Sequence, residues 1–135
     1  MKNFTWPVRV YFEDTDVGGV VYYANYLRYL ERARSEWLRT MGFDQSRLMQ
    51  DTGLGFAVRS VAAEYLKPAR LDDELRVSCG IKMLGRAQIV FEQTIERGTE
   101  TLLTATIRLA CMDLARGRAA AVPQDIYDQF AKLTI

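Results

Sequence analysis

Histidine is absent from this chain of 135 residues, and its absence narrows the chemistry that the chain can perform. Without histidine there is no Ser-His-Asp or Cys-His nucleophile system and no histidine general base, and nearly every kind of zinc site is excluded as well. Carboxylates, tyrosines and lysines remain as the acid–base candidates. We therefore expect carboxylate chemistry and no metal site.

The chain also has only two cysteines and a net charge close to zero. Cys79 and Cys111 fall in apolar runs without metal-ligand spacing, so we expect reduced core thiols in a cytoplasmic protein. The 18 basic and 17 acidic residues give a net charge of +1 and form no block, which argues against nucleic-acid or polybasic membrane binding. No run approaches the roughly 20 apolar residues of a membrane span, and no apolar core of a signal peptide precedes the first charges. The expected partners are small molecules.

Apolar residues, in contrast, are plentiful at 49% of the chain, and no linker, repeat or low-complexity segment interrupts them. We expect a single domain over residues 1–135, long enough to bury about two-thirds of its unfolded surface.

The first third of the chain predicts a strand, a bend and a long helix. Apolar and polar residues alternate over residues 8–13, which predicts a strand with Val8, Val10 and Phe12 on its buried face. Gly18-Gly19 then gives the backbone the freedom to bend. Beyond the bend, apolar residues recur at helical spacing over 26–41, and Gly42 follows as a C-terminal cap, which predicts a helix of about twenty residues.

The rest of the chain predicts mainly antiparallel strands. We expect a short helix capped by Asp44, a strand over 56–67, a hairpin of runs 75–83 and 89–95 around Gly85-Arg86, a central strand over 101–114 and a last helix opening at Pro123. This order indicates an α+β fold in which an antiparallel sheet of about five strands wraps around the 26–41 helix. No strand–helix–strand alternation or dinucleotide fingerprint supports a Rossmann fold.

The candidate chemistry lies between the first strand and the long helix, where Asp14 and Asp16 precede the bend. A carboxylate beside the free N–H groups of a helix start can polarise and attack a carbonyl. Residues two apart on extended backbone share a face, so geometry from the sequence does not separate the two aspartates. Both also suit the structural roles of turn former or helix cap.

The residues of this stretch carry a resemblance to a known family. Residues 8–16, Gly18-Gly19-Val20-Val21-Tyr22, Asn25-Tyr26 and Glu31-Arg32-Ala33-Arg34 resemble the hot-dog thioesterases related to 4-hydroxybenzoyl-CoA thioesterase, and the Tol-Pal-associated acyl-CoA thioesterase branch is most similar. Glu64-Tyr65 and the run from Pro68 to Asp73 extend the resemblance over most of the chain. It implies a hot-dog fold and cofactor-free hydrolysis of an acyl-coenzyme A thioester, with an acyl carrier protein as an alternative carrier.

The resemblance also implies roles for two residues. The family's essential carboxylate, the aspartate just before the bend, falls on Asp16, which would act as general base or as nucleophile. The backbone amide that polarises the substrate carbonyl falls on Tyr23. The Tol-Pal-associated branch commonly has histidine at that position, so any proton transfer or acyl preference that depends on a histidine side chain is not expected here.

Coenzyme A carries phosphates, and the resemblance places a basic nucleotide-binding residue at Arg86. Arg59, Lys67 and Arg70 are further candidates from the neighbouring strand and turn, and for each of the four a solvated surface charge is the alternative. Hot-dog subunits pair so that each site draws residues from both chains. The resemblance therefore implies a homodimer as the minimum active unit, or a homotetramer.

Three alternatives remain open at this point. The first is a non-catalytic acyl-binding or protein-interaction module on the same fold. Hot-dog dehydratases and hydratases typically use a histidine with the acid, and this chain has none. Other hot-dog branches place the catalytic carboxylate on the central helix, so Glu31 and Glu36 are alternatives to Asp16, although their spacing indicates solvent-facing positions.

Overall fold

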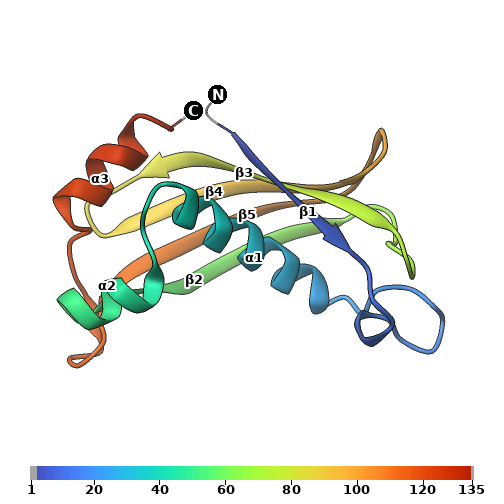
Figure 1. Ribbon diagram of the computed structural model, residues 1–135, viewed down its shortest axis with the longest axis horizontal. Helices are drawn as coiled ribbons and strands as arrows, with labels where there is room; N and C mark the ends of the chain where they lie inside the picture. Colours follow the sequence, from blue (N-terminus) through green and yellow to red (C-terminus); the bar gives the residue numbers. More distant parts are fainter. Residues whose placement is uncertain (1–2, 135) are drawn as a thin grey trace.

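The computed structural model describes residues 3–134, which form one antiparallel sheet around a central helix (Figure 1). The strands pair in the order β1-β3-β4-β5-β2, and a short β6 pairs with β5. Their bounds are β1 Phe4–Arg9, β2 Leu54–Tyr65, β3 Glu74–Leu84, β4 Gln88–Arg97, β5 Glu100–Asp113 and β6 Arg118–Ala119. The helices are α1 Asn25–Thr40, α2 Gln45–Thr52 and α3 Gln124–Ala131, with a 3-10 turn, η1, at Phe12–Asp14. The expected α+β fold is confirmed.

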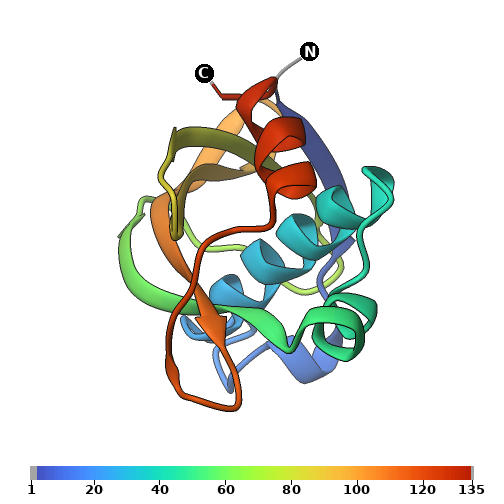
Figure 2. The same ribbon diagram turned by 90° about the vertical axis from the view of Figure 1, so that its left-hand side faces the viewer.

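Helix α1 is the centre of the core, and its apolar stripe forms as the sequence predicts. The stripe is buried against the sheet, which curls around the helix in the end-on view of Figure 2. Trp37 stacks on Phe4 of β1, with ring centroids 6.0 Å apart, and meets Phe91 of β4 edge-on at 6.2 Å. The helix ends before Gly42, whose φ of +87° is the left-handed conformation of a glycine cap.

The first strand differs from the expectation. β1 covers residues 4–9 and pairs with β3 from Phe4, opposite Cys79, to Arg9, opposite Glu74. After Val10 the chain turns into η1, because the Asp14 carboxylate accepts a hydrogen bond from the Tyr11 amide at 2.9 Å. Phe12 is consequently 81% exposed, so the prediction that it faces the core is wrong.

The later elements follow the prediction closely. The Asp44 carboxylate caps α2, accepting from the Ser46 amide at 2.9 Å, and β2 begins and ends two residues earlier than expected. The hairpin of β3 and β4 turns at residues 85–87, and β5 lies between β4 and β2 as a central strand. Cys79 and Cys111 are buried free thiols. No helix within residues 3–134 has the length and apolar character that crossing a membrane requires.

The two outer strands of the sheet are unlike each other. β1 is a short edge strand interrupted by Pro7, which has no N–H to offer a further strand. β2 has 12 residues and no proline, and among the described residues it pairs only with β5. α1 packs against β1 and β3, so much of the inward face of β2 stays uncovered.

Candidate active site

The bend after Asp16 closes into a small antiparallel ladder. The Asp16 amide donates to the Val20 carbonyl at 2.9 Å, Thr15 bridges Val21, and the Tyr22 amide donates to the Asp14 carbonyl at 3.0 Å. Gly19 turns the chain with a φ of +78°, a conformation that an L side chain rarely adopts. The ladder brings the two aspartates next to the start of α1.

The structure gives the two aspartates different surroundings. Asp14 is half-buried, and its carboxylate caps η1 through the Tyr11 amide. The Asp16 side chain is exposed, and the one hydrogen bond that it makes within residues 3–134 is from the Gly18 amide to Oδ1, at 2.8 Å. Asp14 therefore shapes the turn, whereas the second carboxylate oxygen of Asp16 remains open to a ligand.

The start of α1 has no side-chain cap. Ala24 occupies the N-cap position, no acidic residue lies in the first turn, and no hydrogen bond of the Tyr23 amide is found within residues 3–134. The free N–H groups and partial positive charge of a helix start suit an acceptor that gains negative charge. Tyr23 itself is 63% exposed, so a substrate can reach its backbone.

Tyrosine side chains from two elements hold this helix start in place. The Tyr65 hydroxyl at the end of β2 donates to the Tyr23 carbonyl at 3.1 Å, and its ring meets the Tyr26 ring edge-on at 5.4 Å. The Tyr26 hydroxyl accepts from the Ala69 amide at 2.9 Å. Sequence reasoning does not identify this function of Tyr65, because a contact across 42 residues leaves no signal in local spacing.

The turn after β2 supports the bend from the other side. The Val21 amide donates to the Ala69 carbonyl at 2.9 Å, and Arg70 bridges Val20. Arg97 fastens this turn through a 2.7 Å ion pair with Asp73 and a hydrogen bond to the Pro68 carbonyl. Burial acts to raise the pKa of Asp73, but the hydrogen bonds from Arg97 and the Arg70 amide hold it below its ordinary value.

The expected cationic residues do not gather at one place. Arg70 lies beside the bend, and Lys67, in the same turn, pairs with Glu100 at 3.0 Å. Arg59 sits at the bulge in the middle of β2. Arg86 lies just beyond the end of β3, whereas the aspartates lie near the start of this 11-residue strand, which is roughly 35 Å long. One chain alone therefore does not bring Arg86 to Asp16.

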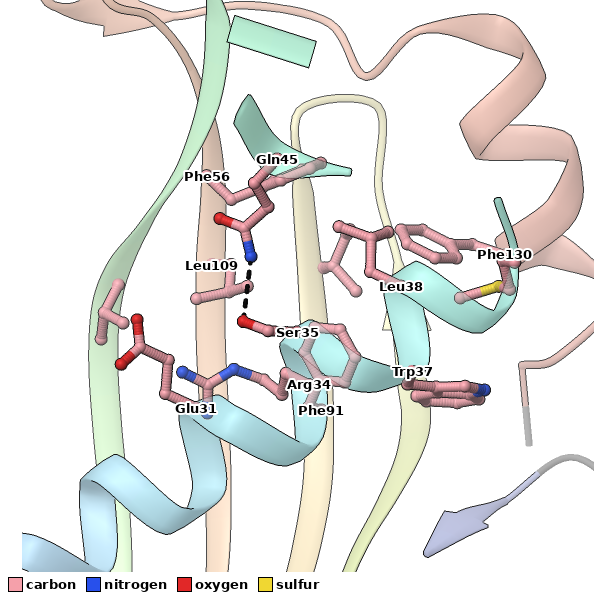
Figure 3. A pocket seen from close by; sticks show the side chains of 13 residues that line it. Glu31, Arg34, Ser35, Trp37, Leu38, Gln45, Phe56, Phe91, Leu109 and Phe130 are labelled. Carbon is pink, nitrogen blue, oxygen red and sulfur yellow. Dashed lines mark hydrogen bonds between the residues drawn. The ribbon is translucent and has the colours of Figure 1, made fainter. Parts of the chain in front are cut away.

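A cavity of about 70 Å³ lies between α1, β2 and the sheet (Figure 3). Its walls are mostly apolar, and several of them are aromatic. Glu31 and Arg34 of α1 also line it, and the Gln45 side chain donates to the Ser35 hydroxyl across one side at 3.1 Å. The largest apolar side chains around it are Trp37, Leu38, Phe56, Phe91, Leu109 and Phe130.

The two glutamates of α1 are poor substitutes for Asp16 within one chain. Glu36 pairs with Arg39 at 3.0 Å. Glu31 is exposed, as its spacing predicts, and lies at the rim of the cavity, but it is eight residues beyond Tyr23, roughly 12 Å along the helix. A thioester held at the Tyr23 amide would be out of its reach.

The family model that matches this chain and two similar relatives all indicate a thioesterase. The model of the thioesterase-like superfamily matches residues 10–130. The acyl-CoA thioesterase YbgC of Haemophilus influenzae is 45% identical over 98% of this chain and 97% of its own length. The acyl-CoA thioester hydrolase YbgC of Escherichia coli O157:H7 is 44% identical over 94% of this chain and 95% of its own.

Solved structures agree in fold. A probable thioesterase from Bartonella henselae has a TM-score of 0.86 and 35% identity, and covers 90% of this chain and 99% of its own. A mutant 4-hydroxybenzoyl CoA thioesterase complexed with 4-hydroxybenzoyl CoA has a TM-score of 0.87 and 26% identity over 96% and 99% of the two chains. The expected hot-dog fold is confirmed, and this chain belongs to the thioesterase-like superfamily.

Proposed function

We propose that the protein hydrolyses acyl-coenzyme A thioesters at the bend before α1. The observation that carries the proposal is the open carboxylate of Asp16 beside a helix start whose Tyr23 amide has no acceptor within residues 3–134. One group can attack or activate water while the other receives the carbonyl oxygen. Relatives that are 44–45% identical are named acyl-CoA thioesterase or acyl-CoA thioester hydrolase, which supports the same reaction here.

The mechanism follows from these two groups. The carbonyl oxygen of the thioester accepts from the Tyr23 amide, and a donor aimed at the developing oxyanion lowers the barrier by about 3 kcal/mol. Ionised Asp16 then either takes a proton from an attacking water or attacks the carbonyl carbon itself. In the second case water hydrolyses the resulting anhydride. Both routes release the free acid and the coenzyme A thiol.

The positions of the cationic residues support a paired active unit. Arg86 and Asp16 lie at opposite ends of one sheet, whereas a two-fold axis through the middle of the sheet would reverse the ends of the second chain. The partner's Arg86 would then approach the end that carries Asp16 and could hold the nucleotide phosphates. We propose a homodimer as the smallest active form, with pairing of dimers into a tetramer as a further step.

The site is also compatible with an acyl carrier protein as the thiol carrier, because the proposed chemistry involves only the thioester. Buried, unpaired Cys79 and Cys111 fit the reducing cytoplasm, where we propose that the protein acts.

A thiol-release assay over a panel of acyl-CoA and acyl-carrier substrates tests the proposal. Asp16→Asn should lower kcat by at least about 100-fold, the usual contribution of a positioned acid–base group. Asp14→Asn is the matched control, since an asparagine oxygen can still accept from the Tyr11 amide, and it should stay within a few-fold of wild type. A folded Asp16→Asn variant with wild-type turnover would refute the mechanism, and a wild type that cleaves no substrate would favour a non-catalytic acyl-binding module.

A further inference from the structure

One buried hydroxyl has no hydrogen-bond partner in this fold. Tyr29, in the second turn of α1, is fully buried, and its hydroxyl is the one buried side-chain nitrogen or oxygen of residues 3–134 that makes no hydrogen bond. A buried polar group without a partner lowers stability, so such groups are rare in folded proteins. Phenylalanine would fill the same space without this cost. The hydroxyl of Tyr29 therefore requires an explanation.

The neighbours of Tyr29 hold its ring in place and keep its hydroxyl protonated. The ring meets that of Tyr26 edge-on, with centroids 6.3 Å apart, and the Arg32 guanidinium lies 6.0 Å from its centre. Burial, and after it the Asp14 carboxylate nearby, raises the pKa of Tyr29. The hydroxyl is thus a hydrogen-bond donor, and the carboxylate of Asp14 is the acceptor beside it.

The Asp14 carboxylate has an oxygen to spare for this donor. Oδ2 accepts from the Tyr11 amide at 2.9 Å, and no hydrogen bond to Oδ1 is found within residues 3–134. The terminal torsion of an aspartate side chain is broad, so a turn of the carboxylate can complete a hydrogen bond from the Tyr29 hydroxyl. The carboxylate therefore has two donors on the inner side of the bend.

The alternative place for this carboxylate is the open start of α1. The main chain of Asp14 is tied to that start, because its carbonyl accepts from the Tyr22 amide at 3.0 Å and from the Asn25 side chain at 2.9 Å. Aspartate is among the best helix caps, and the helix dipole attracts its charge. The Tyr23 amide, which lies between these two contacts, has no acceptor within residues 3–134. An Asp14 carboxylate turned outward would compete with the substrate for this amide.

We propose that Tyr29 is a positioning residue, whose hydroxyl retains the Asp14 carboxylate on the inner side of the bend and so keeps the Tyr23 amide open for the thioester carbonyl. The inference rests on the function proposed above and adds a residue to that site. It explains both why a hydroxyl is buried with no other partner and why the helix start is uncapped although a carboxylate lies close to it. Tyr29 touches no reacting atom and acts through Asp14.

Steady-state kinetics with one acyl-CoA substrate test this role. In Tyr29→Phe the carboxylate loses its inner donor and competes with the substrate, so KM should rise by about five-fold, the strength of an ordinary helix cap. The value of kcat should stay near that of the wild type, because saturating substrate displaces the carboxylate. Tyr127→Phe is the matched control, since it removes a hydroxyl from α3, at the far end of the molecule from the bend (Figure 1), and it should leave KM unchanged.

A double-mutant cycle shows whether Tyr29 acts through Asp14. Asp14→Asn removes the competing charge, so adding Tyr29→Phe to it should leave KM unchanged. The Tm of Tyr29→Phe should stay close to that of the wild type, because the carboxylate exchanges one donor for another. A lower Tm with an unchanged KM would show that the hydroxyl serves packing alone. Either that result or a KM that rises equally in the Asp14→Asn background would overturn the inference.

The amide resonances of isotope-labelled protein test the same contact without hydrolysis. The Tyr23 amide proton should move downfield in Tyr29→Phe, because it gains a carboxylate acceptor, and should keep its wild-type position when Asp14→Asn is also present. A wild type that cleaves no thioester, together with this shift, leaves the inference intact and refutes the proposed function. An active wild type whose Tyr23 amide does not respond to Tyr29→Phe supports the function and overturns the inference.

Discussion

Replacing Gly18 by alanine should lower activity, whereas replacing Gly19 by alanine should lower stability. Gly18 lies against the Asp16 carboxylate, and Gly19 has a left-handed backbone conformation. The backbone of Gly18 is open to other residues, but an added Cβ would lie 3.3 Å from Oδ1 of Asp16. An added Cβ at Gly19 would meet nothing within 4 Å, but its φ is +78°. Gly18→Ala therefore displaces the carboxylate, whereas Gly19→Ala strains the chain.

The magnitudes follow from these contacts. A contact of 3.3 Å requires the carboxylate to move by a few tenths of an ångström, and a misplacement of 1 Å can cost about 100-fold, so Gly18→Ala should lower kcat by about 3- to 10-fold. Its folded state should be unchanged or more stable by about 0.5 kcal/mol, because alanine restricts the unfolded chain. Gly19→Ala should lose about 1–2 kcal/mol, the usual cost of a left-handed conformation for an L residue.

The assay pairs thermal unfolding with steady-state kinetics on one acyl-CoA substrate. We expect Gly18→Ala to keep the wild-type Tm and lose turnover, and Gly19→Ala to lower Tm by roughly 4–8 °C. A fully active Gly18→Ala enzyme would refute the reasoning, because it would show that the position of the Asp16 carboxylate does not matter for the reaction.

Two further predictions concern stability and thiol chemistry. Because the pKa of Asp73 is lowered in the folded state, its pair with Arg97 stabilises the protein above the unfolded pKa of the carboxyl, near 3.9, and that contribution is lost as the pH falls through the lower folded pKa. Acid unfolding monitored by circular dichroism should therefore begin at a higher pH when the Arg97 donors are removed by Arg97→Met, and an unshifted transition would contradict the assigned contact. Burial raises the pKa of Cys79 to about 12, so native protein at pH 8 should react slowly with a thiol reagent and both cysteines should react after denaturation. Rapid labelling of Cys79 in the folded protein would show that the core opens there.

Much of the fold is predictable because its patterns are local. The helical spacing from Tyr26 to Trp37 reports the buried face of α1, and Asp44 and Gly42 mark helix ends by their own conformational preferences. Phe12 shows the limit of alternation. Its position in a strand-like pattern is overridden by one hydrogen bond from the Tyr11 amide to Asp14, which turns the chain.

The candidate site is predictable only in part. Asp14 and Asp16 look equivalent in the sequence, and their difference arises from which amide each carboxylate meets. Tyr65 reaches Tyr23 through the curl of the sheet, and the separation of Arg86 from Asp16 depends on the length and direction of β3. These features depend on the tertiary structure, so they cannot be predicted from the spacing of residues in the sequence.

The uncapped start of α1 has a consequence for anyone who would engineer this protein. A stabilisation design would choose Ala24 first, because aspartate or serine at an N-cap usually strengthens a helix by about 1 kcal/mol. Either side chain would offer its own oxygen to the amides that the proposed reaction leaves open for the substrate. In a more heat-resistant variant made in this way, the new side chain would compete with the substrate for these amides. A screen for thermal stability alone would select such a variant despite its lower activity.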